Sequence, residues 1–184
     1  MKKHIQRLEQ RKLMQERVFV KADLELKESI LSENSSEFMQ RVYETAGKDR
    51  PPAEEGTEKS KPQSSWDGYG EGAATKAKKL YREISKRTHP DKDPSGHYAD
   101  IFAGAASAYE SCNLFDLYEY CDLLGIEYLM DEVEVTAVKE EIAEKRQRAK
   151  VIESSFAYLW SIHESEKMRE IIVKQFIKAV GGKL

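Results

Sequence analysis

The stretch Leu80-Tyr-Arg-Glu-Ile-Ser-Lys-Arg-Thr-His-Pro-Asp-Lys92 decides how the centre of this 184-residue chain folds. Its apolar residues continue a pattern that begins at Ala73 and recurs at three- and four-residue steps. This periodicity predicts an amphipathic helix over about 73–88. Pro90 ends the helix, because the residue before a proline is pushed out of helical geometry. We therefore expect His89 and Asp91 to lie in a loop that Pro90 stiffens.

Two further helices are expected after this loop in the sequence. Small and aromatic residues between Tyr98 and Cys112 share one face and predict a helix that packs antiparallel to the first. Asn113 is expected to cap a short third helix, which Gly125 closes. Residues 73–125 then form one module.

The first 47 residues are expected to be helical. Val18 to Leu26 alternate apolar and polar residues, which leaves a strand as the alternative in that stretch. Ser35 or Ser36 is expected to cap a separate short helix that ends at Gly47. Apolar residues of this segment fit a heptad seam, on which Lys12 and Gln15 also fall. They are Ile5, Leu8, Phe19, Ala22 and Leu26.

The rest of the chain supplies a linker and a helical end. Residues 48–72 are rich in Pro, Gly, Ser, Lys and Glu, which predicts a flexible linker with Trp66 and Tyr69 as docking points. In residues 126–184, a long helix opening at Thr136 and a last helix capped by Ser165 are expected to form a hairpin. The predicted fold class is all-α, in four segments: 1–47, 48–72, 73–125 and 126–184.

Charge is segregated along the chain. The formal net charge is only −3, but residues 76–92 carry seven basic and two acidic side chains, a local +5. Residues 93–138 carry ten carboxylates and no Lys or Arg. The acidic stretch is expected to attract the basic helix within the fold, and it would repel the phosphates of a nucleic acid.

Several classes of protein are disfavoured by composition. No apolar run approaches the ~20 residues of a membrane span, and the N-terminus lacks the apolar block of a signal peptide. Cys112 and Cys121 are too few for a disulfide scaffold, which favours the cytoplasm. No CxxC or HxxxH pair suggests zinc, and nothing supplies a phosphate loop or an oxyanion hole. We therefore expect no metal, no cofactor and no enzymatic activity.

Residues 73–125 resemble the J domain of DnaJ-type co-chaperones. The resemblance rests on the basic amphipathic helix, on the tripeptide His89-Pro90-Asp91 at its end, and on a following helix that carries Phe102 and the Ala108-Tyr109-Glu110 step. The protein would be a divergent member of the J-domain-only class. It departs from the family pattern at Lys86 and Thr88, and the short apolar helix that usually precedes the basic one is missing. Either Trp66 and Tyr69 partly replace that helix, or Phe38–Tyr43 or the C-terminal hairpin packs there instead.

The resemblance implies a binding function without bond chemistry. The helix and loop would engage an ATPase chaperone of the heat-shock protein 70 (DnaK) type, and the Asp would speed its ATP hydrolysis. Independently of the family, a carboxylate on a stiff loop suits pairing with an Arg, and a basic stripe attracts an acidic partner. The candidate partner-binding residues are His89, Pro90, Asp91, Lys92, Lys78, Lys79, Arg82 and Lys86.

Other assignments remain open on the sequence alone. The flanking helices would bind a client or an assembly partner, and a homo-oligomer is one such assembly. The alternative function is a structural or scaffold protein, cellular or viral, that keeps a degenerate J-like fold without co-chaperone activity. The loop could also be a helix-terminating turn and the stripe a solvated helix face.

Overall fold

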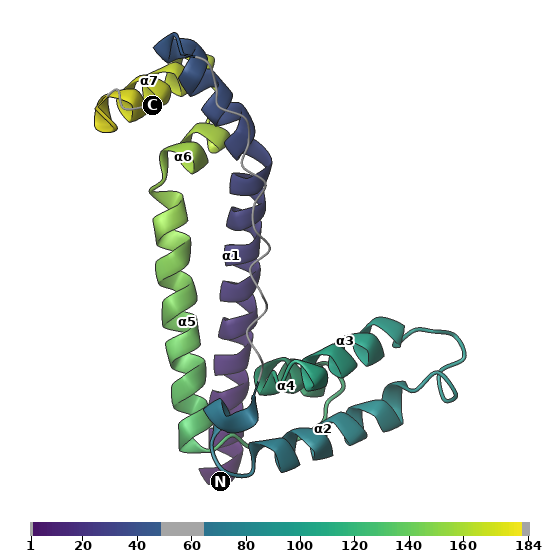
Figure 1. Ribbon diagram of the computed structural model, residues 1–184. Coiled ribbons are helices and arrows are strands. Elements are labelled where there is room, and N and C mark those ends of the chain that lie inside the picture. Colours follow the sequence, from purple (N-terminus) through teal and green to yellow (C-terminus); the bar gives the residue numbers. More distant parts are fainter. Residues whose placement is uncertain (1, 49–64, 182–184) are drawn as a thin grey trace. The chain divides into compact units, whose positions relative to one another are not determined.

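The computed structural model describes residues 2–48 and 65–181. These residues form seven α-helices and one short 3-10 helix, and no strand (Figure 1). The predicted all-α class is confirmed. No helix in the described ranges is both long enough and apolar enough to cross a membrane.

The chain divides into two compact units. The first contains residues 2–18 and 65–142, and the second contains residues 19–48 and 143–181. Two helices contribute to both units, namely α1 (Lys2–Ala46) and α5 (Glu132–Glu153). The four segments predicted from the sequence therefore do not coincide with the units, because each unit combines residues from distant parts of the chain.

Helix α1 confirms the helical prediction for this segment and differs from it in two ways. It is one continuous helix, so neither the strand over 18–26 nor the separate helix after Ser35 forms. The Ser35 hydroxyl donates to the Leu31 carbonyl one turn earlier, which lets a serine remain inside a helix. The heptad seam is not the buried face, since Phe19 is 70% exposed. Gly47 ends the helix as expected, in a left-handed conformation.

The centre of the first unit is built from α2 (Ala73–Thr88), α3 (Ala99–Glu110) and α4 (Leu114–Leu123), which all pack against one another. Figure 1 shows α2 and α3 lying side by side and joined by the loop at their far ends. Asn113 caps α4 by accepting from the Asp116 amide at 3.1 Å, as predicted. The buried residues of this centre are Ala73, Ala77, Leu80, Ile84, Thr88, Ala105, Ala108, Leu114, Phe115, Leu117, Tyr118 and Cys121.

Aromatic residues attach the short helix η1 (Trp66–Tyr69) to this centre. The Trp66 ring lies 5.7 Å from that of Tyr109, and Tyr69 meets Phe115 edge to face at 5.0 Å. The two residues named as docking points do pack on the helices, so the predicted linker does not extend to residue 72. Residues 49–64 of that linker lie outside the described part of the chain.

The C-terminal prediction was wrong for the long helix and right in placing Ser165 at the start of the last one. Helix α5 begins at Glu132, because Asp131 and Glu134 form a capping box in which each carboxylate accepts from the other's amide at 2.9 Å. It ends at Glu153, and Ser155 then caps a separate helix, α6 (Phe156–Ile162). Helix α7 (Glu166–Ala179) packs on α6. In the second unit, a core that includes Phe38 of α1 replaces the expected two-helix hairpin.

Candidate functional site

Helix α2 ends where the sequence places its end. Its last residue, Thr88, is buried, and the Thr88 hydroxyl donates to the Ile84 carbonyl at 3.0 Å. His89 follows in an extended conformation, with φ −61° and ψ 136°, as a residue before proline requires. Its amide still donates to the Ser85 carbonyl at 2.9 Å. The loop therefore starts in a defined direction from the helix.

The His89 ring is held between two neighbours. Its Nδ1 accepts a hydrogen bond from the Asp91 amide at 3.2 Å, and the ring meets Phe102 of α3 edge to face at 5.5 Å. Asp91 Oδ2 lies 3.4 Å from the same Nδ1, yet the Asp91 side chain is 88% exposed. The contacts fix the histidine and leave the carboxylate facing solvent on a constrained loop.

The second half of the loop is fastened by Asp93. Its carboxylate accepts from the Ser95 hydroxyl and from the Tyr98 amide, the latter at 2.7 Å. These two hydrogen bonds, that of Ser95 first, hold the pKa of Asp93 below its ordinary value. Gly96 turns the chain with φ 71°, a region that disfavours residues with a side chain. The loop between α2 and α3 is thus tied at both ends.

A basic stripe lies on the solvent face of α2. We use this name for Lys78, Lys79, Arg82 and Lys86, all of which are exposed. Lys86 Nζ lies 2.7 Å from Glu83 Oε1, and this hydrogen bond lowers the pKa of Glu83. Within the described residues, Lys78, Lys79 and Arg82 form no ion pair. Three of the four charges are therefore available to an acidic partner.

Four of the eight candidate residues meet at one pocket. Arg82, Lys86, His89 and Lys92 line a pocket of about 530 Å³ together with three residues not proposed as site residues. Pro90 and Asp91 lie on the adjoining loop, and Lys78 and Lys79 lie farther back along α2. The three other residues are Tyr81, Ser85 and Phe102. Tyr81 and Ser85 could have been found from the sequence, because they precede His89 at four-residue steps on the same face of the helix.

The acidic stretch contacts α1 more than it contacts the basic stripe. Its carboxylates Asp116 and Glu119 bind Arg17, and Asp122 and Glu127 lie near Arg11 and Arg7. Among the described residues, the ion pair that joins this stretch to α2 is that of Lys76 with buried Glu134. Lys76 is outside the stripe, so the paired acids leave the stripe open.

Arg17 is a buried structural residue that the sequence did not reveal. Its side chain is 2% exposed, and it binds Asp116 at 3.0 Å, Glu141 at 2.8 Å and Glu119. Burial opposes the charge, but these three carboxylates still raise the pKa of Arg17. Its guanidinium carbon also lies 5.5 Å from the centre of the Phe115 ring. Arg17 thus fixes the first part of α1 to α4 and α5.

Cys121 has the character of a buried, unreactive thiol, and Cys112 is half-buried. Cys121 is buried, and burial raises the pKa of its thiol to about 12. Both cysteines are free. In the described residues, no group of three or more His, Cys, Asp or Glu side chains is placed to hold a metal ion.

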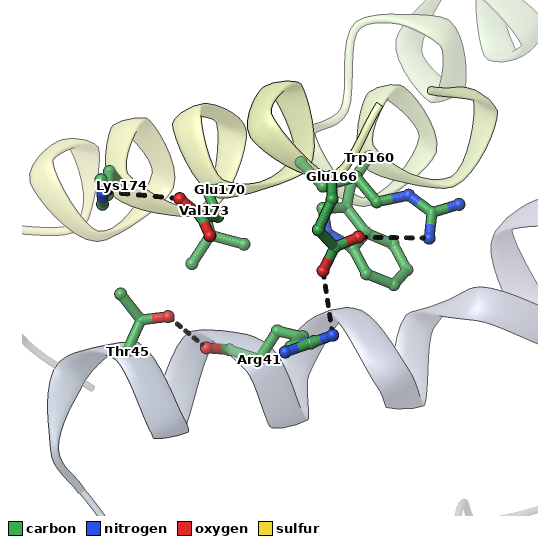
Figure 2. Close-up of a pocket in the computed structure, with 8 residues that line it drawn as sticks. Arg41, Thr45, Trp160, Glu166, Glu170, Val173 and Lys174 are labelled. Carbon is green, nitrogen blue, oxygen red and sulfur yellow. Dashed lines mark hydrogen bonds and ion pairs between the residues drawn. The ribbon is translucent and has the colours of Figure 1, made fainter. Parts of the chain in front are cut away.

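The second unit has a pocket of its own, of about 270 Å³ (Figure 2). Glu166 of α7 bridges Arg41 at 3.0 Å and Arg169 at 4.0 Å, and Arg169 lies 4.7 Å from the centre of the buried Trp160 ring. Each charged residue lining it lies within 4.0 Å of an opposite charge. This pairing is typical of a cluster that fastens α7 to α1, and we assign it no ligand.

No family model, no curated protein and no solved structure matches this chain. The case for a function therefore rests on the loop and the basic stripe themselves.

Proposed function

We propose that this protein is a J-domain co-chaperone that binds a DnaK-type ATPase and stimulates its ATP hydrolysis. The observation that carries the proposal is the exposed Asp91 carboxylate beside a His89 ring that Phe102 and the Asp91 amide hold in place. The basic stripe lies on the helix that leads into this loop. In this assignment α2, α3 and α4 form the J-like module, and the protein performs no bond chemistry.

The helix that the family places before α2 has a substitute in this proposal. Trp66 and Tyr69 of η1 make aromatic contacts with Tyr109 and Phe115. Arg17 of α1 also lies over the Phe115 ring. We assign the packing role of the missing helix to η1 and the first part of α1. The second unit would then present α6 and α7 to a client or an assembly partner, in the cytoplasm.

Single-turnover ATP hydrolysis by a DnaK-type chaperone tests the proposal. Wild-type protein is expected to accelerate hydrolysis, and His89→Gln or Asp91→Asn is expected to reduce that acceleration by about tenfold or more, as for loss of a charge-assisted contact. His97→Gln and Asp100→Asn are the matched controls, because both residues are exposed and lie nearby, His97 in the loop and Asp100 in the first turn of α3. They should retain the full effect.

A scaffold without co-chaperone activity is the second candidate. It is favoured by Thr88, which is smaller than the aromatic residue usual before the histidine, and which is buried at that point. If wild-type protein leaves hydrolysis unchanged, the scaffold assignment replaces the co-chaperone. If stimulation survives His89→Gln and Asp91→Asn together, the activity belongs to another surface.

A further inference from the structure

Helix α1 has two opposite faces, and the fold uses one of them. Gln10, Arg17 and Leu24 recur every seven residues and are all buried, with exposed fractions of 5%, 2% and 5%. Leu31 continues this row and is half-buried. This inner row is the face of α1 that contacts the rest of the chain.

The opposite face carries the heptad pattern, and none of the residues that the structure describes buries it. We call it the outer seam. Its members alternate three- and four-residue steps, as the core positions of a two-stranded coiled coil do. Ile5 is 50% exposed, Leu8 54% and Leu26 61%. The seam consists of Ile5, Leu8, Lys12, Gln15, Phe19, Ala22 and Leu26, all exposed.

We propose that the outer seam binds the outer seam of a second copy of this chain in a parallel two-stranded coiled coil. The inner row lies on the helix face directly opposite the seam, so the contacts of the fold remain in place when the seam is covered. This proposal is independent of the chaperone function, because none of the candidate partner-binding residues lies on α1.

The charges that flank the seam fit a second copy in parallel orientation. In a parallel pair, the residue just before Ile5, Lys12 or Phe19 faces the residue five positions later in the other helix. Arg11 of each helix then faces Glu16 of the other, so opposite charges meet. Arg11 also lies 3.8 Å from Asp122 of its own chain, but it is 57% exposed and can reach a neighbour.

An antiparallel pair is disfavoured by the same residues. In an antiparallel pair, the residues that flank the seam on one side face the same residues of the other helix. On one side these are Glu9, Glu16 and Asp23, so carboxylates would face carboxylates. Like charges facing each other destabilise the pair. The two polar residues at the centre of the seam, Lys12 and Gln15, specify register at a cost in stability. We therefore expect a dimer that dissociates on dilution through the micromolar range.

Sedimentation of the full chain at several concentrations tests the dimer. Wild type is expected to shift from monomer to dimer, and Phe19→Glu is expected to raise the dissociation constant by about tenfold or more, as for a central apolar contact. Val151→Glu is the matched control, because Val151 is also apolar and 58% exposed but lies on α5. Equal circular dichroism spectra of wild type, Phe19→Glu and Val151→Glu would show that all three proteins remain folded.

Disulfide crosslinking tests the orientation. Ser29 is exposed and occupies the next core position of the seam. In a Cys112→Ser background, Ser29→Cys is expected to form a crosslinked dimer under mild oxidation, and Lys150→Cys on exposed α5 is not. A chain that stays monomeric, or a dimer that Phe19→Glu leaves unchanged, overturns the proposal. A dimer that Ser29→Cys does not crosslink overturns the parallel arrangement.

Discussion

Arg17 and Glu141 lie 124 residues apart in the sequence, and their side chains form a hydrogen bond of 2.8 Å in the first unit. Glu119 and Asp116 complete the set of carboxylates around the same guanidinium. One arginine thus joins α1, α4 and α5.

Loss of the Arg17 guanidinium is expected to destabilise the first unit strongly. Arg17→Met removes the cation and leaves three partly buried carboxylates together, which we expect to cost about 3 kcal/mol of the free energy of unfolding. Urea denaturation followed by circular dichroism measures this. Arg41→Met is the control, because the Arg41–Glu166 pair is about half exposed and should contribute less than about 0.5 kcal/mol. Equal effects of the two variants would contradict the role assigned to Arg17.

The sequence predicted best where the signals were local. Gly72 and Pro90 bound α2, and the predicted and observed limits of that helix agree. The Asp131–Glu134 capping box is also local and could have corrected the start of α5. The inner face of α1 could not be found in this way, because Gln10 and Arg17 are polar residues that become buried only through partners about a hundred residues later.

The candidate site likewise has residues that local sequence predicts and contacts that depend on tertiary structure. The loop residues His89 and Asp91 were predictable, because a proline and a helix end determine their conformation. The contact between His89 and Phe102 depends on how α2 and α3 pack. The pairing of the acidic stretch with α1 also depends on tertiary structure, and the local charge count favoured a different partner.

Gln10 is expected to contribute to stability through backbone groups. Its side-chain amide donates to the Met130 carbonyl at 2.7 Å and accepts from the Met130 amide at 3.0 Å, and both contacts are buried. Gln10→Ala leaves these groups without their partner, at a cost of about 1–3 kcal/mol. Urea denaturation checks this against Gln147→Ala on the exposed face of α5. A Gln10→Ala variant as stable as that control would contradict the prediction.

The loop is expected to loosen in acid through Asp93. The pKa of this carboxyl is held below its ordinary value near 3.8, so the ionised form stabilises the loop. That contribution is present at neutral pH and is lost as the pH falls through the lowered pKa. The Tyr98 amide resonance should report the transition, since that amide donates to Asp93. Asp93→Asn should abolish the titration at this amide.

The two cysteines are expected to differ in reactivity. A thiol with a pKa of about 12 is almost entirely protonated at mildly alkaline pH, and Cys121 is buried as well. Iodoacetamide should therefore modify half-buried Cys112 first, and Cys121 only after unfolding. Mass spectrometry of native and denatured samples measures this order. Equal labelling of both in the native protein would contradict it.

The basic stripe is expected to set the rate of encounter with the proposed chaperone. Arg82→Glu places an acidic residue on the stripe and should raise the concentration for half-maximal ATPase stimulation by about tenfold or more. Added salt should weaken the wild-type effect in the same direction. Lys150→Glu changes the charge of the chain equally at an exposed position on α5 and should have little effect. An equal response to both substitutions would show that only net charge matters.

The inner row of α1 also bears on how the protein is made. Residue 17 leaves the ribosome roughly 6 to 25 s before residue 141, at ordinary rates of synthesis. Leucines at positions 10 and 17 would spend that interval as part of an exposed, aggregation-prone surface. Gln10 and Arg17 instead stay well hydrated until Met130 and Glu141 emerge. Their polarity allows this part of α1 to be synthesised well before the residues that bury it.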